Sequence, residues 1–337
     1  MFRHLVGTKR FRSRHFGLGS LSCVLGVSFA TALFVCASVP TVTWAHAHPP
    51  IRTATPHHDI VLRDDIGDVV SLPGPATRIV TLAPSDTQIA LALGLRSKLV
   101  GVDADSLTYM APPYVRLVKG LPSIGDTYPA PSLERILKAR PDLILTASLV
   151  ADTARIRKLD IPVIVLNPLN LHGIEHDVLL VGEATGRTAQ ARTIVHSLAK
   201  GVQALRARVA HAKTRPTVYL EVGTKPLFSV GPGSYINSLL ETLGASNIID
   251  RVSRVSYPEV SPETVVSQNP SVIILDETGV TPASVAARPG WSRVAAVLHH
   301  RIYANVNANA LSEPGPSILT ALRELARDLY PSLFAKR

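Results

Sequence analysis

Cysteine is nearly absent from this chain of 337 residues. Its two cysteines, Cys23 and Cys36, both lie inside an apolar run from Gly17 to Val39. A lipoprotein signal has a small residue just before its cysteine and usually leucine three positions before it. Cys23 lacks that leucine and Cys36 follows Val35, so we expect no lipid anchor. The chain after this run cannot form a disulfide, and we expect a core large enough not to need one.

Aromatic residues are also scarce, at 5% of the chain against 46% apolar residues in all. We therefore expect cores made of leucine, valine, isoleucine and alanine, with the few aromatic side chains left for special positions. The length is sufficient for two α/β domains, each with its own core.

Acidic residues are missing from positions 1–47, which carry five of the 35 basic side chains: Arg3, Lys9, Arg10, Arg12 and Arg14. The remainder then has 30 basic against 25 acidic side chains, so the net charge of +10 falls to a scattered +5. No run of Lys or Arg interleaved with aromatic residues is seen there. We therefore expect no binding of nucleic acid.

The amino terminus has the pattern of a secretory signal peptide. A basic start precedes the apolar run, Pro40 breaks it, and Ala45-His46-Ala47 forms a cleavage site of small residues. We expect residues 1–47 to be removed and residues 48–59, rich in proline and histidine, to form a flexible leader. The alternative is an uncleaved membrane anchor, because the run is long enough to span a bilayer. Either way the protein is expected outside the cytoplasm, in the periplasm.

A single long helix is predicted from Thr188 to His211. Its apolar residues recur at intervals of three and four, which gives one stripe along a helix: Ala191, Ile194, Val195, Leu198, Val202, Leu205 and Val209. A helix of about 24 residues spans about 36 Å, more than one small layer requires. We therefore expect residues 188–213 to connect an N-terminal lobe (60–187) with a C-terminal lobe (214–337).

Strands and helices alternate on both sides of this segment. Near-continuous apolar strands are predicted at 78–82, 99–102, 142–146, 162–166, 217–222 and 271–275. Helices are predicted at 84–94, 132–140, 235–243, 262–268 and 317–329, and a hairpin at 60–72. Such a pattern predicts an α/β fold in which each lobe has a mainly parallel sheet covered by helices on both faces.

The two lobes also share sequence. Four residues of the first recur in the second at one offset of 129: Tyr128, Ser132, Glu134 and Pro141 recur as Tyr257, Ser261, Glu263 and Pro270. An apolar strand follows each proline. Four coincidences at one offset suggest duplicated lobes.

The binding face is expected at the carboxyl ends of the strands, where the loops of the two lobes would oppose each other. These loops hold Ser85 and several of the scarce aromatic residues: Tyr109, Tyr128, Phe228 and Tyr257. Their placement favours stacking on a flat or bulky ligand, although each could instead seal its loop onto the lobe.

Enzymatic motifs are weak. Gly231-Pro-Gly-Ser234 has neither a G-x-G-x-x-G spacing nor a P-loop lysine, and it suits a tight turn before a helix. His172-Gly-Ile-Glu175-His176 matches a zinc pattern, H-x-x-E-H, and leaves an extracytoplasmic metallohydrolase as a distant alternative. No G-x-S-x-G elbow anchors a hydrolase triad.

From about Ile60 to Leu333 the chain resembles the substrate-binding proteins of ABC importers for cobalamin, iron-siderophores and haem. The most specific stretches are 78–85 (RIVTLAPS), 132–144 (SLERILKARPDLI), 231–235 (GPGSY), 243–248 (LGASNI) and 288–291 (RPGW). The resemblance implies two α/β lobes joined by one rigid helix, no enzymatic activity, no cofactor other than the ligand, and a monomer that docks on a permease dimer with its ATPase.

The resemblance also implies roles for individual residues. Tyr128, Phe228 and Tyr257 fall where the cobalamin-binding protein has pocket aromatics, whereas the Tyr-x-Arg stretch of the haem branch is missing at 124–128. Glu134 and Glu263 match the glutamates that pair with permease arginines. A corrinoid, cobalamin above all, is the expected ligand; a ferric siderophore or haem is the alternative.

Two departures from the family pattern bear on the ligand. Gln88 stands where the family often has glutamate, and Glu313-Pro-Gly-Pro-Ser317 stands where Arg-Pro-Gly-Pro-Arg is common. The loss of two basic groups argues against a strongly anionic siderophore.

Overall fold

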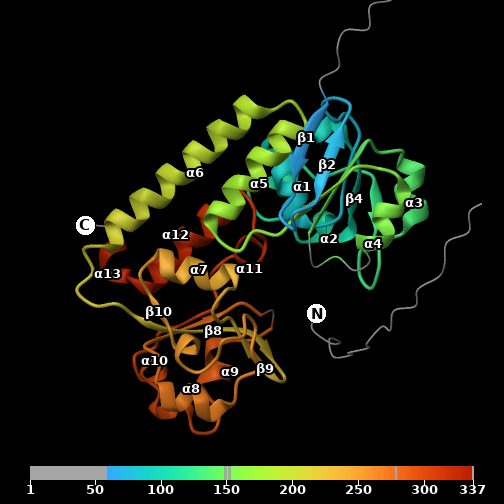
Figure 1. Cartoon of the computed structure of the whole chain (residues 1–337). Helices are drawn as coiled ribbons and strands as arrows, with labels where there is room; N and C mark the ends of the chain where they lie inside the picture. Colours follow the sequence, from blue (N-terminus) through green and yellow to red (C-terminus); the bar gives the residue numbers. More distant parts are fainter. Residues whose placement is uncertain (1–58, 148–149, 151–152, 278, 336–337) are drawn as a thin grey trace, which may run out of the picture. The chain divides into compact units, whose positions relative to one another are not determined.

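The computed structural model describes residues 59–147, 150, 153–277 and 279–335 (Figure 1). The predicted signal peptide and all of the predicted leader except Asp59 lie outside these residues. Within the described part of the chain, none of the helices is long and apolar enough to cross a membrane.

The N-terminal lobe is built on a parallel sheet of five strands in the order β5-β4-β3-β6-β7. The strands are β3 (Ile79–Thr81), β4 (Leu99–Asp103), β5 (Ser123–Gly125), β6 (Leu143–Ala147) and β7 (Val163–Leu166). A hairpin of β1 (Ile60–Arg63) and β2 (Val69–Leu72) precedes it, as predicted. The helices are α1 (Pro84–Ala92), α2 (Ala104–Thr108), α3 (Leu133–Ala139), α4 (Thr153–Ile156) and α5 (Leu171–Ala184), with 3-10 turns at Arg96–Lys98, Tyr114–Arg116 and Arg157–Leu159.

Burial explains why these strands read as continuous apolar runs. Every residue of β3 and β7 is buried, since helices cover the sheet on both faces. The side chains of alternating residues enter different cores: Ile79 joins one hydrophobic cluster, and Val80 joins another on the opposite face.

The C-terminal lobe has a second sheet of five strands. Strands β10 (Ser246–Asn247), β8 (Thr217–Thr224), β11 (Val272–Leu275) and β12 (Ile302–Tyr303) are parallel in that order, and β9 (Leu227–Ser229) pairs antiparallel with β8. The helices are α7 (Tyr235–Thr242), α8 (Pro262–Gln268), α9 (Pro282–Ala286), α10 (Ala295–Leu298), α11 (Ala308–Ser312), α12 (Ile318–Leu329) and α13 (Pro331–Phe334), with 3-10 turns at Ile248–Arg251 and Trp291–Arg293. Phe228 was predicted in a loop, but it lies in β9 because the chain after β8 folds straight back on it.

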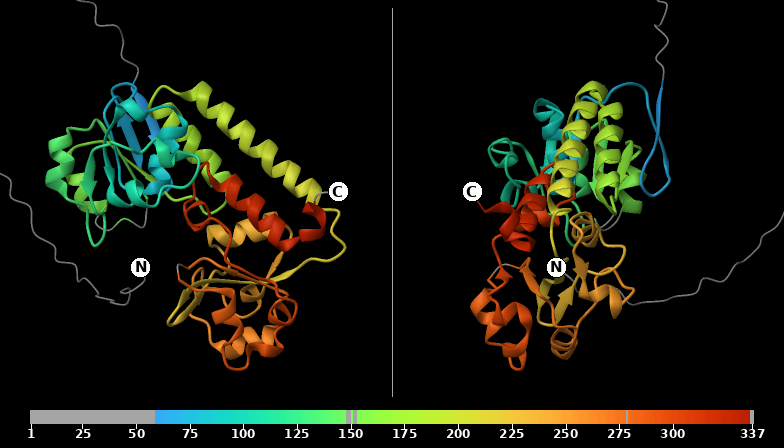
Figure 2. Two further views of the ribbon diagram at one scale, coloured as in Figure 1. Left: turned by 180° about the vertical axis from the view of Figure 1, so that it is seen from behind. Right: turned by 90° about the vertical axis from the view of Figure 1, so that its left-hand side faces the viewer.

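The long helix α6 (Thr188–Val209) confirms the predicted connection between the lobes. Most of its apolar stripe is buried, with Ile194 and Val195 partly buried, and the buried residues lie in two different cores. Ala191 belongs to the cluster that includes the strands of the N-terminal lobe, whereas Leu198, Val202, Leu205 and Val209 belong to the cluster of the C-terminal lobe. The helix packs against α5 and α12, and Figure 2 shows it running alongside α12.

The internal repeat is visible in the structure. Helices α3 and α8 correspond residue for residue at the offset of 129, and so do the first residues of β6 and β11. Each helix ends on a residue in the left-handed region, Arg140 with φ 48° and Asn269 with φ 46°. The residue after each proline also accepts a backbone hydrogen bond at the start of the central strand: Asp142 from Thr77 N–H, two residues before β3, and Ser271 from Thr217 N–H, the first residue of β8.

Candidate functional site

Strand order places a binding face in each lobe. In the first sheet the chain runs from β3 outward to β5 and then returns to the other side of β3 with β6. In the second it passes from β8 to β10 and returns to the other side of β8 with β11. Ligands of open α/β sheets bind outside the carboxyl ends of the strands at such a reversal. The candidate site is therefore made of the residues that follow β3 and β6 in one lobe and β8 and β11 in the other.

A chain of buried hydroxyl groups supports the N-terminal face. Thr87 Oγ1 lies 2.6 Å from Thr81 Oγ1 and 2.8 Å from Ser106 Oγ. Ser106 donates through its hydroxyl to one oxygen of Asp103 and through its N–H, at 2.9 Å, to the other. Asp103 is both the last residue of β4 and the N-cap of α2, so the sheet and two helices are fixed around this carboxylate.

The C-terminal face rests on a buried ion pair. Nη1 and Nη2 of Arg288 each donate at 2.6 Å to one carboxylate oxygen of Glu221, which is fully buried. The guanidinium also stacks on Trp291, 4.8 Å from the ring centre, and Trp291 packs edge-on against Tyr219. This network explains the Arg288–Trp291 stretch of the family pattern: it holds the loop after β11 against the central strand.

One short segment, 312–317, bonds to both faces. Ser312 Oγ donates to Asp276, the residue directly after β11, at 2.7 Å. The carboxyl group of the next residue, Glu313, interacts with the backbone N–H of Ser85. That N–H is otherwise without an N-cap partner, since Ala83 offers no side-chain cap and Pro84 has no N–H. The carboxyl group of Glu313 therefore lies at the start of helix α1 of the other lobe.

The same segment meets α1 one turn later. Ser317 Oγ donates to Gln88 Oε1 at 2.6 Å, and both residues are buried. A Cβ on Gly315 would lie 2.9 Å from that oxygen, so a larger residue would displace the side chain of Gln88. The two departures from the family pattern thus contact each other: a neutral hydrogen bond stands where glutamate and arginine are common.

Several carboxyl groups gather around this segment, and burial raises their pKa values. The pKa of Glu313 is raised to about 8, first by burial and then by the charge of Asp103. Burial raises the pKa of Asp276 to about 7 and that of Asp103 to about 6. The pKa of Asp86 is also raised by burial and by Asp103. Loss of water disfavours each charge, so these acids stay protonated to a higher pH than free carboxyl groups do.

Asp103, Asp276 and Glu313 were not predicted as site residues. A signal for the first two exists in the sequence, because each is an acid at the end of an apolar strand, where the carboxyl edge of a sheet begins. Glu313 has no such signal, since its place depends on a contact with the other lobe.

The predicted ligand-binding residues occupy different environments. Tyr109 and Tyr128 are 55% and 56% exposed, unusually open for tyrosines. Tyr257 is half-buried against the C-terminal core, and burial raises the pKa of its hydroxyl group. Ser85 is buried, and its hydroxyl lies 3.3 Å from Asp86. Phe228 forms an isolated bridge with Glu259. Their role in binding stays a prediction.

The predicted docking residues are equivalent and exposed. Glu134 lies in the first turn of α3 and Glu263 in the first turn of α8. The hydroxyls of Ser132 and Ser261 cap these helices by accepting from the third helical N–H, at 3.4 and 3.1 Å. Each glutamate thus extends from a capped helix start into solvent.

The zinc pattern at 172–176 does not form a shared site in the described residues. His172, with a side chain 88% exposed, contacts Glu175 at 3.2 Å, but His176 turns to Asp65 of the β1–β2 hairpin instead. The group of potential metal ligands found among the described residues is Asp65, His176 and Asp177.

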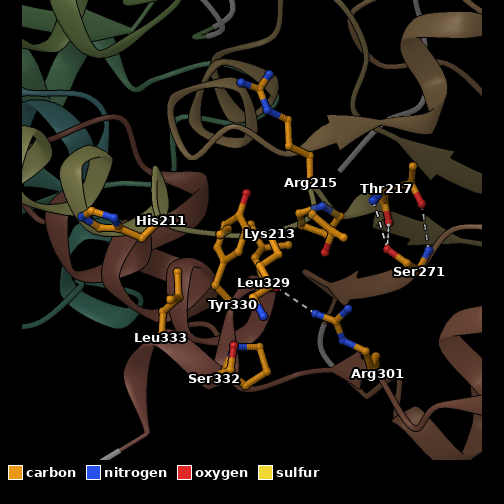
Figure 3. A pocket seen from close by; sticks show the side chains of 14 residues that line it. His211, Lys213, Arg215, Thr217, Ser271, Arg301, Leu329, Tyr330, Ser332 and Leu333 are labelled. Atoms are coloured by element: carbon orange, nitrogen blue, oxygen red, sulfur yellow. Dashed lines mark hydrogen bonds between the residues drawn. The ribbon is translucent and has the colours of Figure 1, made fainter.

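A large hollow of about 800 Å³ lies elsewhere in the C-terminal lobe (Figure 3). Thr217 and Ser271 line it, and both lie at the amino ends of the strands β8 and β11. Arg301 on its wall donates to the carbonyl of Leu329 at 2.8 Å. Its position at the edge opposite the binding face excludes it as the ligand site that the strand order predicts.

Comparison with known proteins agrees with this architecture. Residues 79–305 match the family described as periplasmic binding protein. Over 284 residues the chain is 28% identical to an uncharacterised ABC transporter substrate-binding lipoprotein, YvrC, of Bacillus subtilis, covering 82% of this chain and 87% of that protein. The periplasmic vitamin B12-binding protein of Vibrio cholerae has a similar structure, with a TM-score of 0.64 and 26% identity over 78% of this chain and 99% of that one. A possible iron-binding periplasmic solute-binding protein of Staphylococcus epidermidis gives 0.66 and 27%, over 76% of this chain and 99% of that one. The chain therefore belongs to the periplasmic binding protein family.

Proposed function

We propose that this protein is the solute-binding component of an ABC importer that captures a corrinoid, cobalamin above all, outside the cytoplasm. One observation carries the proposal: segment 312–317 is hydrogen-bonded to Asp276, directly after β11, and to Gln88 of helix α1, which follows β3. The two faces on which strand order places a ligand therefore meet at one segment. A molecule held there would contact both lobes at once.

The charge of these faces favours a neutral ligand rich in amide groups. The carboxyl groups of Asp103, Asp276 and Glu313 repel an anionic siderophore or haem propionates when ionised. Protonated or ionised, they accept hydrogen bonds from amide N–H groups, which a corrinoid carries around its ring. The contact between Gln88 and Ser317 is neutral, so it offers no cation to an anionic ligand.

Exposed aromatic side chains provide the apolar part of the proposed site. Tyr109 and Tyr128 leave more than half of their surface open to solvent, in a chain with few aromatic residues. Such surface is favourable to bury against a flat macrocycle. Tyr257, the repeat counterpart of Tyr128, and Phe228 would complete the contact from the other lobe.

Delivery to the membrane is assigned to the two equivalent glutamates. Glu134 and Glu263 would each pair with arginine on one subunit of a dimeric permease, and such rim charges act on encounter and register. The repeat supports this pairing because it gives each lobe the same exposed carboxylate at the same helix position.

Calorimetric titration of the purified protein tests the ligand. Cyanocobalamin, cobinamide, haemin and a ferric siderophore are compared at pH 7. We expect saturable binding of one equivalent of a corrinoid, and a cost of about 1–3 kcal/mol when Tyr128 or Tyr257 is replaced by alanine. Arg63→Ala, on the distant hairpin, is the control that should bind as the unaltered protein does. Binding of the siderophore or haemin alone would refute the corrinoid assignment while leaving the importer role intact.

A further inference from the structure

Three side chains from distant parts of the N-terminal lobe meet outside the proposed ligand site. Asp65 lies in the turn of the β1–β2 hairpin, and His176 and Asp177 lie on helix α5. Each can offer one ligand atom to a metal ion, and these atoms all lie within 4.8 Å of one another. His176 Nδ1 is 3.2 Å from Asp65 Oδ1 and 3.6 Å from Asp177 Oδ1.

The turn that carries Asp65 is held rigidly. Asp64, which is buried, accepts the N–H groups of Ile66, Asp68 and Val165. Asp65 donates its N–H to the carbonyl of Val165 at 3.2 Å, and its Oδ2 accepts the N–H of Asn167 at 2.6 Å. Oδ2 is thereby engaged by the loop after β7, whereas Oδ1 faces His176. One carboxylate oxygen is thus prepositioned for a further partner.

The environment of Asp177 indicates a bound cation. Its side chain is fully buried, and neither carboxylate oxygen has a hydrogen-bond partner. A buried carboxylate without a partner is costly, so it is normally paired with a cation or coordinates a metal. His176 Nδ1, at 3.6 Å, is too far for a hydrogen bond but close enough for an ion pair when the imidazole is protonated.

A third carboxyl group nearby makes the burial of Asp177 still less favourable. Asp86 of α1, which packs against α5, is fully buried, and its Oδ2 also lacks a partner. It interacts electrostatically with Asp177. Two buried carboxyl groups so placed cannot both ionise at low cost, and a cation next to Asp177 would offset that cost.

The spacing of the ligand atoms suits a small tetrahedral ion. Zinc binds imidazole nitrogen and carboxylate oxygen at about 2.0–2.2 Å, so neighbouring ligand atoms of a tetrahedral site lie about 3.3–3.5 Å apart. The two separations from His176 Nδ1, 3.2 Å to Asp65 and 3.6 Å to Asp177, bracket this range, and the three ligand atoms all lie within 4.8 Å of one another. One imidazole with two carboxylates is a ligand set of zinc-like divalent ions, whereas calcium and magnesium prefer oxygen alone.

We propose that Asp65, His176 and Asp177 bind one zinc-like divalent cation, with water completing the coordination. The side chain of His176 is 54% exposed, which leaves a path for the ion and room for that water. The ion would fasten the β1–β2 turn to helix α5 and neutralise Asp177. This role is structural and does not depend on the identity of the ligand bound between the lobes.

A protonated His176 between the two carboxylates is the competing explanation. It would satisfy the same charges without a metal, with the imidazole proton in the place of the ion. Zinc titration separates the two, because only a coordination site takes up the ion with defined stoichiometry.

The test compares full-length variants, stripped with a chelator and titrated with zinc chloride. The leader contains His48, His57 and His58, which could bind zinc themselves, so the difference between variants is the readout. We expect Asp177→Asn and His176→Gln to bind one zinc less per chain than the unaltered protein, or to bind it at least about tenfold more weakly. His172→Ala, one helical turn away and exposed, should retain that zinc.

Thermal unfolding provides a second measurement on the same proteins. Zinc should raise the midpoint of the unaltered protein and of the His172→Ala variant, but not that of Asp177→Asn, because only binding to the folded state stabilises it. Magnesium should shift none of them. Equal zinc binding by Asp177→Asn and the unaltered protein would overturn the proposal, and so would loss of the zinc in His172→Ala, which would assign it to the 172–176 pattern.

Discussion

Replacing Gly201 by alanine in the middle of α6 sets two effects of known size against each other. In a helix interior, alanine is about 1 kcal/mol more favourable than glycine. Here, however, the new methyl would meet the side chain of Leu319 on α12, with Cδ1 at 2.9 Å and Cγ at 3.3 Å. Overpacking of this kind costs about 1–3 kcal/mol, at the low end here because Leu319 is only partly buried and can turn. We expect the free energy of unfolding to be unchanged or lowered by about 1 kcal/mol.

The sign should reverse when the obstacle is removed. In a Leu319→Ala background the same Gly201→Ala change keeps its helical gain and meets no clash, so it should stabilise the protein by about 1 kcal/mol. Urea unfolding of the four proteins, followed by circular dichroism, gives the coupling energy of the cycle, expected at about 1–2 kcal/mol. If Gly201→Ala stabilises both backgrounds equally, α6 and α12 do not pack at this point and the contact is refuted.

Three further predictions concern charge. The raised pKa values of Asp103, Asp276 and Glu313 mean that the folded state holds protons that the unfolded chain releases, so the free energy of unfolding should fall as pH rises from about 5 to 8. Glu313→Gln should flatten this decline in denaturant titrations, and an unaltered slope would contradict the assigned pKa. Arg288→Ala should cost about 3–5 kcal/mol in urea unfolding, because it strands the buried carboxylate of Glu221, and a loss under 1 kcal/mol would count against the ion pair. Glu134→Ala combined with Glu263→Ala should leave corrinoid affinity unchanged and abolish stimulation of the permease ATPase. An exposed control, Glu183→Ala, should stimulate the ATPase normally. Full stimulation by the double variant would refute the docking role, and the two glutamates would then only stabilise the starts of their helices.

Local patterns predicted the framework well. The spacing of apolar residues located α6 within two residues at its carboxyl end, and the recurrence of Ser-x-Glu ahead of proline located α3 and α8. These signals are readable because helix periodicity, capping and buried strands depend on neighbours in sequence. Helix α5 was not predicted as a separate element, although Asn170 caps it and its buried residues recur at helical spacing.

The candidate site could be predicted only in part, because its chemistry depends on residues brought together by the fold. The H-x-x-E-H pattern placed His172 and His176 in one site. In the structure His176 instead contacts Asp65, which the turn of the β1–β2 hairpin brings close. The partnership of Glu313 with Ser85 joins positions more than 200 residues apart in the sequence, and no local pattern encodes it. Exposure of Tyr128 was likewise not readable, since it depends on which loops pack over the ring.

The division of helix α6 between two hydrophobic clusters has a consequence for how the molecule unfolds. Leu198 and Val202 lie in the core of one lobe, while Ala191, two turns earlier on the same rod, lies in the core of the other. If either lobe unfolded, one end of α6 would lose the core residues that it packs against. The exposed half of the helix would then be only marginally stable in water. The lobes therefore share a single cooperative unit: calorimetry should record one endotherm, and hydrogen exchange should find the amides of α6 protected to the level of global unfolding.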